Sequence, residues 1–233
     1  KDACLLLHGF TGYPGELVFL AEELNKAGFT VHVPRLPGHG TNGRDLSEST
    51  GDQWLRHCLD VYLDLASTFA SVSILGYSLG GILAILLAER FGPERIALIA
   101  PGIRNSNRAI VFAPLLRLFL RRYHHPYGRP MEDRDLEHLR TEYWSYRYAG
   151  PIAEVYRLQR KARRALPGLT SRTLVIASKK DPVVPVSVCD LILGKSRNAR
   201  VETLILQESP HQMTDGPEKE IIASAVTGWF LAE

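Results

Sequence analysis

The serine with the clearest chemical meaning in this sequence is Ser78, within Gly-Tyr-Ser-Leu-Gly at 76–80. The apolar, partly β-branched residues 72–75 predict a buried strand before it, and the apolar run 82–88 predicts a buried helix after it. Ser78 therefore sits on a strand-to-helix turn, in the Gly-x-Ser-x-Gly pattern of a nucleophile elbow. Such a turn is too tight for a side chain at either glycine, and it places the serine hydroxyl at a helix N-terminus, where negative charge is stabilised.

A serine nucleophile needs a general base, usually histidine, and a carboxylate that orients the imidazole. In an open parallel sheet, these side chains must come from loops at the carboxyl ends of strands. Asp181 and His211 each occupy such a loop, after the predicted strands at 173–177 and 201–206. The sequence therefore predicts Ser78 as the nucleophile, His211 as the general base and Asp181 as the acid that orients His211.

Two other acids compete with Asp181 for this role. Glu208 and Asp215 are close to His211 in sequence, and a neighbouring carboxylate can reach an imidazole. We prefer Asp181 because its loop follows the strand that should lie beside the strand leading to His211. Two prolines also stiffen the Asp181 loop.

The oxyanion formed during acyl transfer needs two backbone N–H donors. The N–H of Leu79, directly after the nucleophile, is the first predicted donor. The N–H of Phe10, in the turn after the predicted strand at 3–7, is the second. His8 and His39 lie in loops on the same side of the sheet. We assign them structural roles, packing beneath the site and hydrogen bonding to loop backbone, rather than proton transfer.

Strand-like and helix-like segments alternate along most of the chain. This alternation predicts an α/β fold with a mostly parallel open sheet and helices on both faces. The predicted strands cover 3–7, 29–33, 72–75, 95–100, 173–177 and 201–206. The predicted helices cover 15–27, 52–66 with Asp52 as N-cap, 82–90, 186–193 and 221–231.

One segment, 101–167, interrupts the alternation, and no strand is predicted in it. Helical patterns occur in it near 109–123, 133–149 and 151–166. We expect it to be a helical cap inserted over the carboxyl ends of the strands, between two parts of a core at 1–100 and 168–233. The first and third helices should each turn an apolar face towards the pocket or core and a basic face outward. The apolar residues of the first are Phe112, Leu115, Leu116, Phe119, Leu120 and Tyr123.

Five motifs carry a resemblance to a known family. They are Leu-Leu-Leu-His-Gly-Phe-Thr-Gly at 5–12, Leu-Pro-Gly-His-Gly-Thr at 36–41, Gly-Tyr-Ser-Leu-Gly-Gly at 76–81, Asp-Pro-Val-Val-Pro at 181–185 and Ser-Pro-His at 209–211. Together they resemble a bacterial carboxylesterase of the monoacylglycerol-lipase-like branch of the α/β-hydrolases, in which nucleophile, acid and histidine follow in this chain order. The resemblance covers 3–100 and 173–233. It implies a cap where 101–167 lies and ester hydrolysis without a cofactor.

The expected function is hydrolysis of carboxylic esters with short to medium acyl chains, or of monoacylglycerols, because a cap leaves a bounded pocket. An acyltransferase or thioesterase that uses the same triad stays open. A non-catalytic binding protein of this fold is disfavoured because every triad member is present. Serine at position 78 argues against dehalogenases and epoxide hydrolases, which use a carboxylate at the elbow. No cofactor, metal or nucleic-acid partner is predicted.

The formal net charge of +3 is unevenly distributed. From Pro101 to Arg172, fifteen basic residues stand against six acidic ones, a net charge of +9, so the rest of the chain carries −6. Such a bias is typical of a solvated arginine-rich surface, and less often of weak contact with an anionic membrane surface. Three widely spaced cysteines offer no disulfide framework, and no signal peptide is visible, so a reducing cytoplasm is the expected location.

Overall fold

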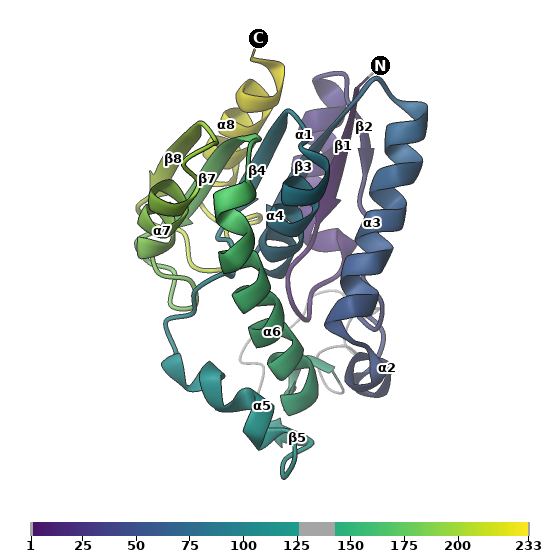
Figure 1. Ribbon diagram of the computed structural model, residues 1–233, viewed down its shortest axis with the longest axis vertical. Coiled ribbons are helices and arrows are strands. Elements are labelled where there is room, and N and C mark those ends of the chain that lie inside the picture. Colours follow the sequence, from purple (N-terminus) through teal and green to yellow (C-terminus); the bar gives the residue numbers. More distant parts are fainter. Residues whose placement is uncertain (1, 126–142, 233) are drawn as a thin grey trace.

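A computed structural model of the chain describes residues 2–125 and 143–232 (Figure 1). Six parallel strands form its central sheet. Each lies where a strand is predicted, which confirms the α/β fold with a parallel sheet. The strands are β1 (Asp2–Leu7), β2 (Thr30–His32), β3 (Ser71–Tyr77), β4 (Arg95–Ile99), β7 (Arg172–Ser178) and β8 (Val201–Leu206).

The order of the strands in the sheet is β2-β1-β3-β4-β7-β8. The chain moves outward from β1 to β2, then returns to the other side of β1 and continues through β3 to β8. In open α/β sheets, ligand sites lie at the carboxyl ends of the strands, at the point where the strand order reverses. Leu7 pairs with Gly76 and Tyr77 pairs with Ile99, so the strand that leads to Ser78 ends in the middle of the sheet.

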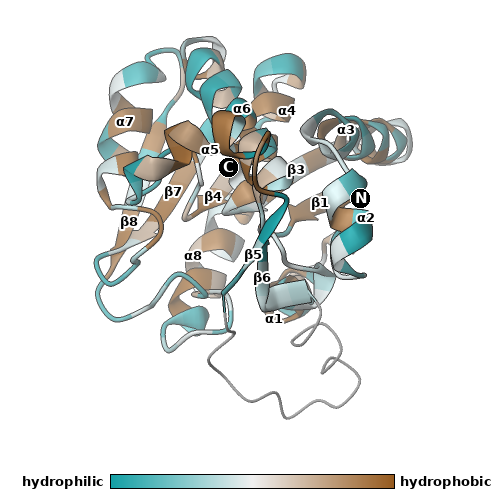
Figure 2. Cartoon of the chain, turned by 90° about the horizontal axis from the view of Figure 1, so that it is seen from below, coloured by the Kyte–Doolittle hydropathy of each residue, from teal (hydrophilic) through white to brown (hydrophobic). Residues whose placement is uncertain are grey.

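Helices cover both faces of the sheet, as predicted. Figure 2 shows α3, α4, α6 and α7 on one side and α1 and α8 on the other. α4 contacts both α3 and α6, and α1 contacts α8 across the opposite face. Their bounds are α1 (Val18–Lys26), α3 (Gly51–Thr68), α4 (Leu79–Phe91), α6 (Ala149–Ala165), α7 (Ser187–Lys195) and α8 (Lys219–Leu231). All residues from Leu79 to Ala88 in α4 are buried, as their continuous apolar run requires.

Two features near the start of α3 differ from the sequence prediction. The N-cap of α3 is Thr50 rather than Asp52. Its hydroxyl accepts the Gln53 N–H (3.3 Å), and the Gln53 side chain accepts the Thr50 N–H (2.8 Å). This reciprocal capping box satisfies two backbone donors, which a single aspartate cannot do. Before it lies a short helix that the sequence did not predict, α2 (Gly43–Glu48), with Asn42 as its N-cap.

The inserted segment 101–167 departs most from the prediction. It contains two strands, β5 (Arg122–His124) and β6 (Tyr146–Tyr148), which pair antiparallel. The expectation of no strand there is therefore wrong. The helix expected over 133–149 falls largely on 133–142, outside the described residues, and its end is β6 rather than helix.

The helix expected over 109–123 is also wrong. A 3₁₀ turn, η2 (Arg108–Phe112), leads into a single helical turn, α5 (Ala113–Leu116), and β5 follows. The apolar stripe that predicted the helix is not buried, since Phe112 and Phe119 are 59% and 82% exposed. Without a packed face, a short helix is marginal in water. Here the chain leaves the helix and satisfies backbone groups in the β5–β6 pair instead.

The third predicted helix of the segment, 151–166, is confirmed as α6 (Ala149–Ala165). Its buried face includes Val155, Leu158 and Ala162, and its exposed face carries Arg160 and Arg164. α6 contacts α4 in the layer that covers the sheet as well as α5 in the inserted segment. The division of the chain into a core and a cap at 101–167 stays a prediction.

Candidate active site

Ser78 lies at the sharp turn between β3 and α4, with φ 53° and ψ −108°. Positive φ strains a residue with a side chain, and such a conformation persists only where the surroundings hold it. Here the Ser78 N–H donates to the Ile99 carbonyl (2.9 Å), and the Gly102 N–H donates to the Ser78 carbonyl (2.9 Å). Backbone from the neighbouring strand β4 and the loop after it therefore fixes the turn.

The glycines on either side of Ser78 are required by close backbone approach. A Cβ added at Gly76 would collide with the carbonyl of Gly80. A Cβ added at Gly80 would collide with the carbonyl of Leu7, at the end of β1. The steric reason for the Gly-x-Ser-x-Gly pattern is therefore confirmed.

His211, in the loop after β8, reaches Ser78 across the carboxyl ends of the strands. The Ser78 Oγ and His211 Nε2 atoms are 3.1 Å apart. The loop is also held through its backbone, because the hydroxyl of buried Tyr77 donates to the His211 carbonyl (2.9 Å). Since Tyr77 directly precedes Ser78, one strand end sets the positions of both side chains.

Asp181, in the loop after β7, contacts the other nitrogen of the imidazole, with 2.7 Å between Asp181 Oδ2 and His211 Nδ1. Its carboxylate is fully buried. The second oxygen, Oδ1, accepts the N–H groups of Val183 (2.7 Å) and Val184 (3.0 Å). A carboxylate can only accept, so this contact places the proton of a neutral His211 on Nδ1. Nε2 is then available to accept the proton of Ser78.

The two competing acids have other partners. Glu208 forms an ion pair with Lys180, and Asp215 forms one with Lys219 (3.3 Å). Their side chains are 60% and 83% exposed. The geometry therefore leaves the buried carboxylate as the acid next to His211.

The two predicted oxyanion donors follow two neighbouring strands of the sheet, β3 and β1. Leu79 is the first residue of α4, and Phe10 follows β1, which pairs with β3. Within residues 2–125 and 143–232, neither backbone N–H donates a hydrogen bond to another residue. An N–H left unpaired at a helix N-terminus is a ready donor for an anion, and that is the chemistry an oxyanion requires.

Glu16 lies beside the turn that carries Phe10, and the sequence analysis missed it. Its carboxylate accepts the Gly9 N–H (3.3 Å), and a Cβ added at Gly12 would collide with that carboxylate. Burial raises the pKa of Glu16 to about 7, although the hydrogen bond from Gly9 acts in the opposite direction. No sequence signal marks this residue, because an acid near a helix start is ordinary.

His8 and His39 are buried and make structural contacts, in line with the roles assigned to them. His8 Nε2 accepts the Leu36 N–H (3.1 Å) and so ties two loops together. His39 Nδ1 lies 3.0 Å from the Pro37 carbonyl, and its ring packs edge-on against Trp54. Burial lowers the pKa of His8 to about 3 and that of His39 to about 4. Both imidazoles are therefore neutral at pH 7.

The described residues show no metal centre. In 2–125 and 143–232, no three His, Cys, Asp or Glu side chains gather closely enough to hold a metal ion. Cys4, Cys58 and Cys189 are free, buried thiols, and burial raises the pKa of each. Over the same ranges, no helix has the length and apolar character needed to cross a bilayer.

Comparison with known sequences identifies the family. The model of the alpha/beta hydrolase family matches residues 4–215. A thermostable monoacylglycerol lipase from Bacillus sp. (strain H-257) is 30% identical over 210 residues, which cover 90% of this chain and 82% of that protein. A carboxylesterase from Bacillus subtilis (strain 168) is 24% identical, over 94% of this chain and 88% of that protein.

Solved structures show the same fold. A structure reported with the metagenome-derived lipolytic enzymes LipS and LipT has a TM-score of 0.86 and 24% identity, and the match covers 100% of this chain and 94% of that one. The monoacylglycerol lipase of Paleococcus ferrophilus has a TM-score of 0.77 and 16% identity, over 97% of this chain and 92% of that one. The chain belongs to the alpha/beta hydrolase family, in the branch of the bacterial monoacylglycerol lipases and carboxylesterases.

Proposed function

We propose that this protein hydrolyses carboxylic esters through a covalent acyl-enzyme, with Ser78 as nucleophile, His211 as general base and Asp181 as the orienting acid. The observation that carries the proposal is the continuous path of contacts from the Ser78 hydroxyl through His211 to a buried carboxylate. The strained turn at Ser78 supports it, since such strain gathers at functional sites. The relatives named monoacylglycerol lipase and carboxylesterase support the same reaction class.

In the first half of the proposed reaction, Ser78 Oγ attacks the ester carbonyl while His211 Nε2 takes its proton. The imidazolium is stabilised by Asp181, whose negative charge is held by two backbone N–H groups. The negative oxygen of the tetrahedral intermediate is bound by the N–H groups of Phe10 and Leu79. His211 then gives its proton to the leaving alcohol, and an acyl-Ser78 ester remains.

In the second half, water replaces the alcohol. His211 Nε2 removes a proton from the water as it attacks the acyl carbonyl, and the same two N–H groups bind the second oxyanion. When this intermediate collapses, His211 returns the proton to Ser78 Oγ and the acid leaves. Every proton transfer uses Nε2. The contact of Nδ1 with Asp181 matters because it keeps the other proton on Nδ1 and leaves Nε2 free to accept and return protons.

The proposed substrates are esters with short to medium acyl chains, or monoacylglycerols. Two of the curated relatives are named monoacylglycerol lipases. The inserted segment also stands at the carboxyl ends of the strands, where α5 and β5 extend from the lower end of the molecule in Figure 1. A cap in that position would bound the acyl-chain pocket.

The proposed enzyme also makes weak contact with membrane surfaces. The side chains of Leu118 and Phe119 are 69% and 82% exposed, next to Arg121 and Arg122. Exposed apolar residues beside basic ones favour an anionic lipid surface. Sedimentation with anionic vesicles, compared between the wild type and Leu118→Ser/Phe119→Ser, tests this contact.

The central test combines an ester screen with labelling of the nucleophile. We expect turnover of p-nitrophenyl esters, highest between acetate and decanoate, and fluorophosphonate labelling at Ser78. Ser78→Ala should lower kcat on the order of 10⁵-fold with an unchanged far-UV spectrum. Added alcohols and acyl-CoA distinguish hydrolysis from acyl transfer. A fluorophosphonate adduct on another serine would overturn the assignment.

A further inference from the structure

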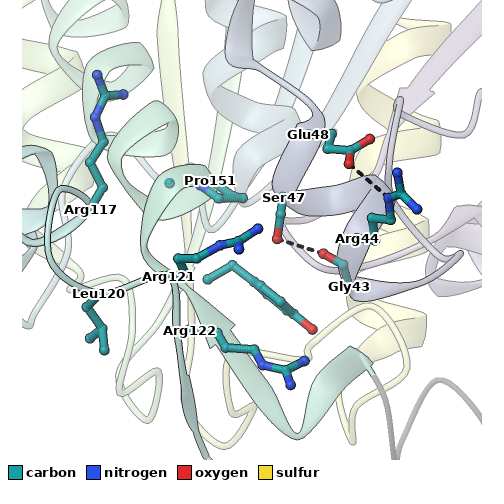
Figure 3. Close-up of a pocket in the computed structure, with 11 residues that line it drawn as sticks. Gly43, Arg44, Ser47, Glu48, Arg117, Leu120, Arg121, Arg122 and Pro151 are labelled. Atoms are coloured by element: carbon teal, nitrogen blue, oxygen red, sulfur yellow. Dashed lines mark hydrogen bonds and ion pairs between the residues drawn. The ribbon is translucent and has the colours of Figure 1, made fainter.

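A pocket of about 470 Å³ lies between α2, the α5–β5 segment and the N-terminus of α6 (Figure 3). None of Ser78, Asp181 and His211 lines it. Four arginines line this pocket: Arg44 from α2, and Arg117, Arg121 and Arg122 from the α5–β5 segment. One acidic residue, Glu48, also does so. The walls therefore carry a strong excess of positive charge.

The arginines differ in how far their charge is compensated. Arg44 pairs with Glu48 (2.9 Å), and Arg117 lies 3.5 Å from Glu154. Within the described ranges, Arg121 and Arg122 form no ion pair with a carboxylate. Two guanidinium groups that line the pocket thus have no paired carboxylate, an arrangement that an anionic ligand would stabilise.

The N-terminus of α6 adds to this positive charge. Gly150 and Pro151, in the first turn of α6, form part of the wall. Because this turn lines the pocket, the positive end of the α6 dipole adds to the positive potential there. The Ala149 N–H donates to the Arg121 carbonyl (3.1 Å) and Pro151 has no N–H, so the Gly150 N–H is the donor left in this turn. Figure 3 shows the Arg121 side chain extending towards Ser47 of α2, on the opposite wall. The Ser47 hydroxyl already donates to the Gly43 carbonyl (2.7 Å), so Arg121 is the main donor on this side of the pocket.

We propose that this pocket binds a phosphate-bearing ligand, a phosphomonoester or phosphodiester with a small organic group. The two N–H groups of an arginine fork can each bond one oxygen of a phosphate group. A phosphate carries up to two negative charges and a carboxylate carries one, so a pocket with several arginines suits a phosphate better. The volume exceeds that of inorganic phosphate, so the pocket has room for the attached organic group. Two sources share this chemistry: a free phosphate ester and the headgroup of an anionic lipid.

The test begins with isothermal titration of inorganic phosphate and glycerol 3-phosphate at constant ionic strength, set with chloride. We expect saturable binding of both, and weakening by at least tenfold in Arg121→Gln/Arg122→Gln. The matched control is Arg160→Gln/Arg164→Gln, which removes the same charge from the exposed face of α6 outside the pocket and should leave binding within twofold. Because Arg122 also stacks on Tyr146 (4.5 Å), Arg121→Glu alone serves as a second variant that keeps this contact between β5 and β6.

A second arm separates the two sources. Phosphatidylglycerol vesicles are compared with phosphatidylcholine vesicles, with the wild type and Arg121→Glu. Loss of phosphatidylglycerol binding in the variant that Leu118→Ser/Phe119→Ser does not reproduce assigns the pocket to lipid headgroups, whereas unchanged vesicle binding with lost glycerol 3-phosphate binding assigns it to a free ester. No saturable phosphate binding by the wild type, or an equal loss in the control variant, would overturn the proposal. Ester hydrolysis by Ser78 is measured separately and does not decide either outcome.

Discussion

The turn at Ser78 and the turn at α5 both join an apolar segment to the start of a helix, but they meet opposite surroundings. Residues Leu79–Ala88 of α4 are all buried, and backbone groups from β4 and the loop after it hold Ser78. α5 stops after one turn, and Leu118 and Phe119 beyond it are largely exposed. Backbone hydrogen bonds at 117–120 run only to residues three or four positions earlier.

The difference shows which of the two turns is fixed by contacts with other parts of the chain. At Ser78, strained backbone and buried polar contacts persist because neighbouring strands over-determine them. At α5, the support beyond local hydrogen bonds is the packing of α5 on α6 and the contact between Arg117 and Glu154 (3.5 Å), so less resists a change of conformation. We therefore expect substitutions at the first region to have large effects and substitutions at the second to have small ones.

The largest expected effect at the first region comes from Asp181→Asn. The amide can donate to His211 Nδ1, which favours the tautomer with its proton on Nε2 and prevents that nitrogen from accepting the proton of Ser78. We expect kcat to fall on the order of 10⁴-fold with little change in KM. Glu208→Gln and Asp215→Asn are the matched controls, and steady-state kinetics should show less than a threefold change for each. A greater loss in either control would reassign the acid.

Gly80→Ala should have the next largest effect, on stability. The new Cβ would collide with the Leu7 carbonyl, and neither β1 nor α4 can move without disturbing the sheet. We expect the unfolding free energy to fall by at least about 3 kcal/mol. The control is Gly228→Ala in α8, where no atom lies within 4 Å of the added Cβ; it should gain about 0.5–1 kcal/mol. Urea unfolding measures both, and equal effects would remove the steric argument.

The same contrast explains how far the sequence could be interpreted. The strands were predictable because their short apolar runs, rich in β-branched residues, favour buried strands. The Ser78 turn was predictable because the spacing of its glycines, between a strand and a helix, indicates one kind of turn. Asp181 was predictable as the acid from the order of the strands. It follows β7 and His211 follows β8, and these two strands are paired in the sheet. The geometry agrees with these predicted site residues, but their catalytic roles stay predictions.

The rest could not be predicted, for physical reasons. The stripe from Phe112 to Tyr123 has helical spacing, but spacing cannot tell whether a partner surface exists to bury it. The β5–β6 pairing joins residues more than twenty positions apart, and no local pattern specifies such pairing. Glu16 was missed because its burial depends on how the turn after β1 folds over it. The arginine pocket also assembles only in three dimensions, from α2, α5, β5 and α6.

A smaller, pH-dependent effect is expected at Glu16, next to the Phe10 turn. Because its pKa rises from 4.5 to about 7 on folding, the folded state binds this proton more tightly than the unfolded state does. Its contribution to stability is complete below pH 4.5 and is lost as the pH rises through about 7. At about 1.4 kcal/mol per pKa unit, the loss is at most about 3.5 kcal/mol.

Glu16→Gln should remove this loss while keeping an oxygen that accepts the Gly9 N–H. Urea unfolding at pH 5 and pH 8 should therefore show the variant gaining stability relative to the wild type as the pH rises. Glu22→Gln, an exposed change in α1, controls for the removal of one negative charge. Parallel pH dependence of Glu16→Gln and wild type would show that the Glu16 carboxyl is solvated in the folded protein.

The smallest expected effect completes the comparison at α5. Phe119 is 82% exposed, so Phe119→Ala removes a side chain that buries little surface on folding. We expect the unfolding free energy to change by less than about 0.5 kcal/mol. Leu83→Ala, in the buried part of α4, is the contrasting variant and should lower it by about 2–5 kcal/mol. Urea unfolding measures both. A loss above about 1 kcal/mol for Phe119→Ala would mean that this side chain is packed in solution, and the chain after α5 would then be held by tertiary contacts as the Ser78 turn is.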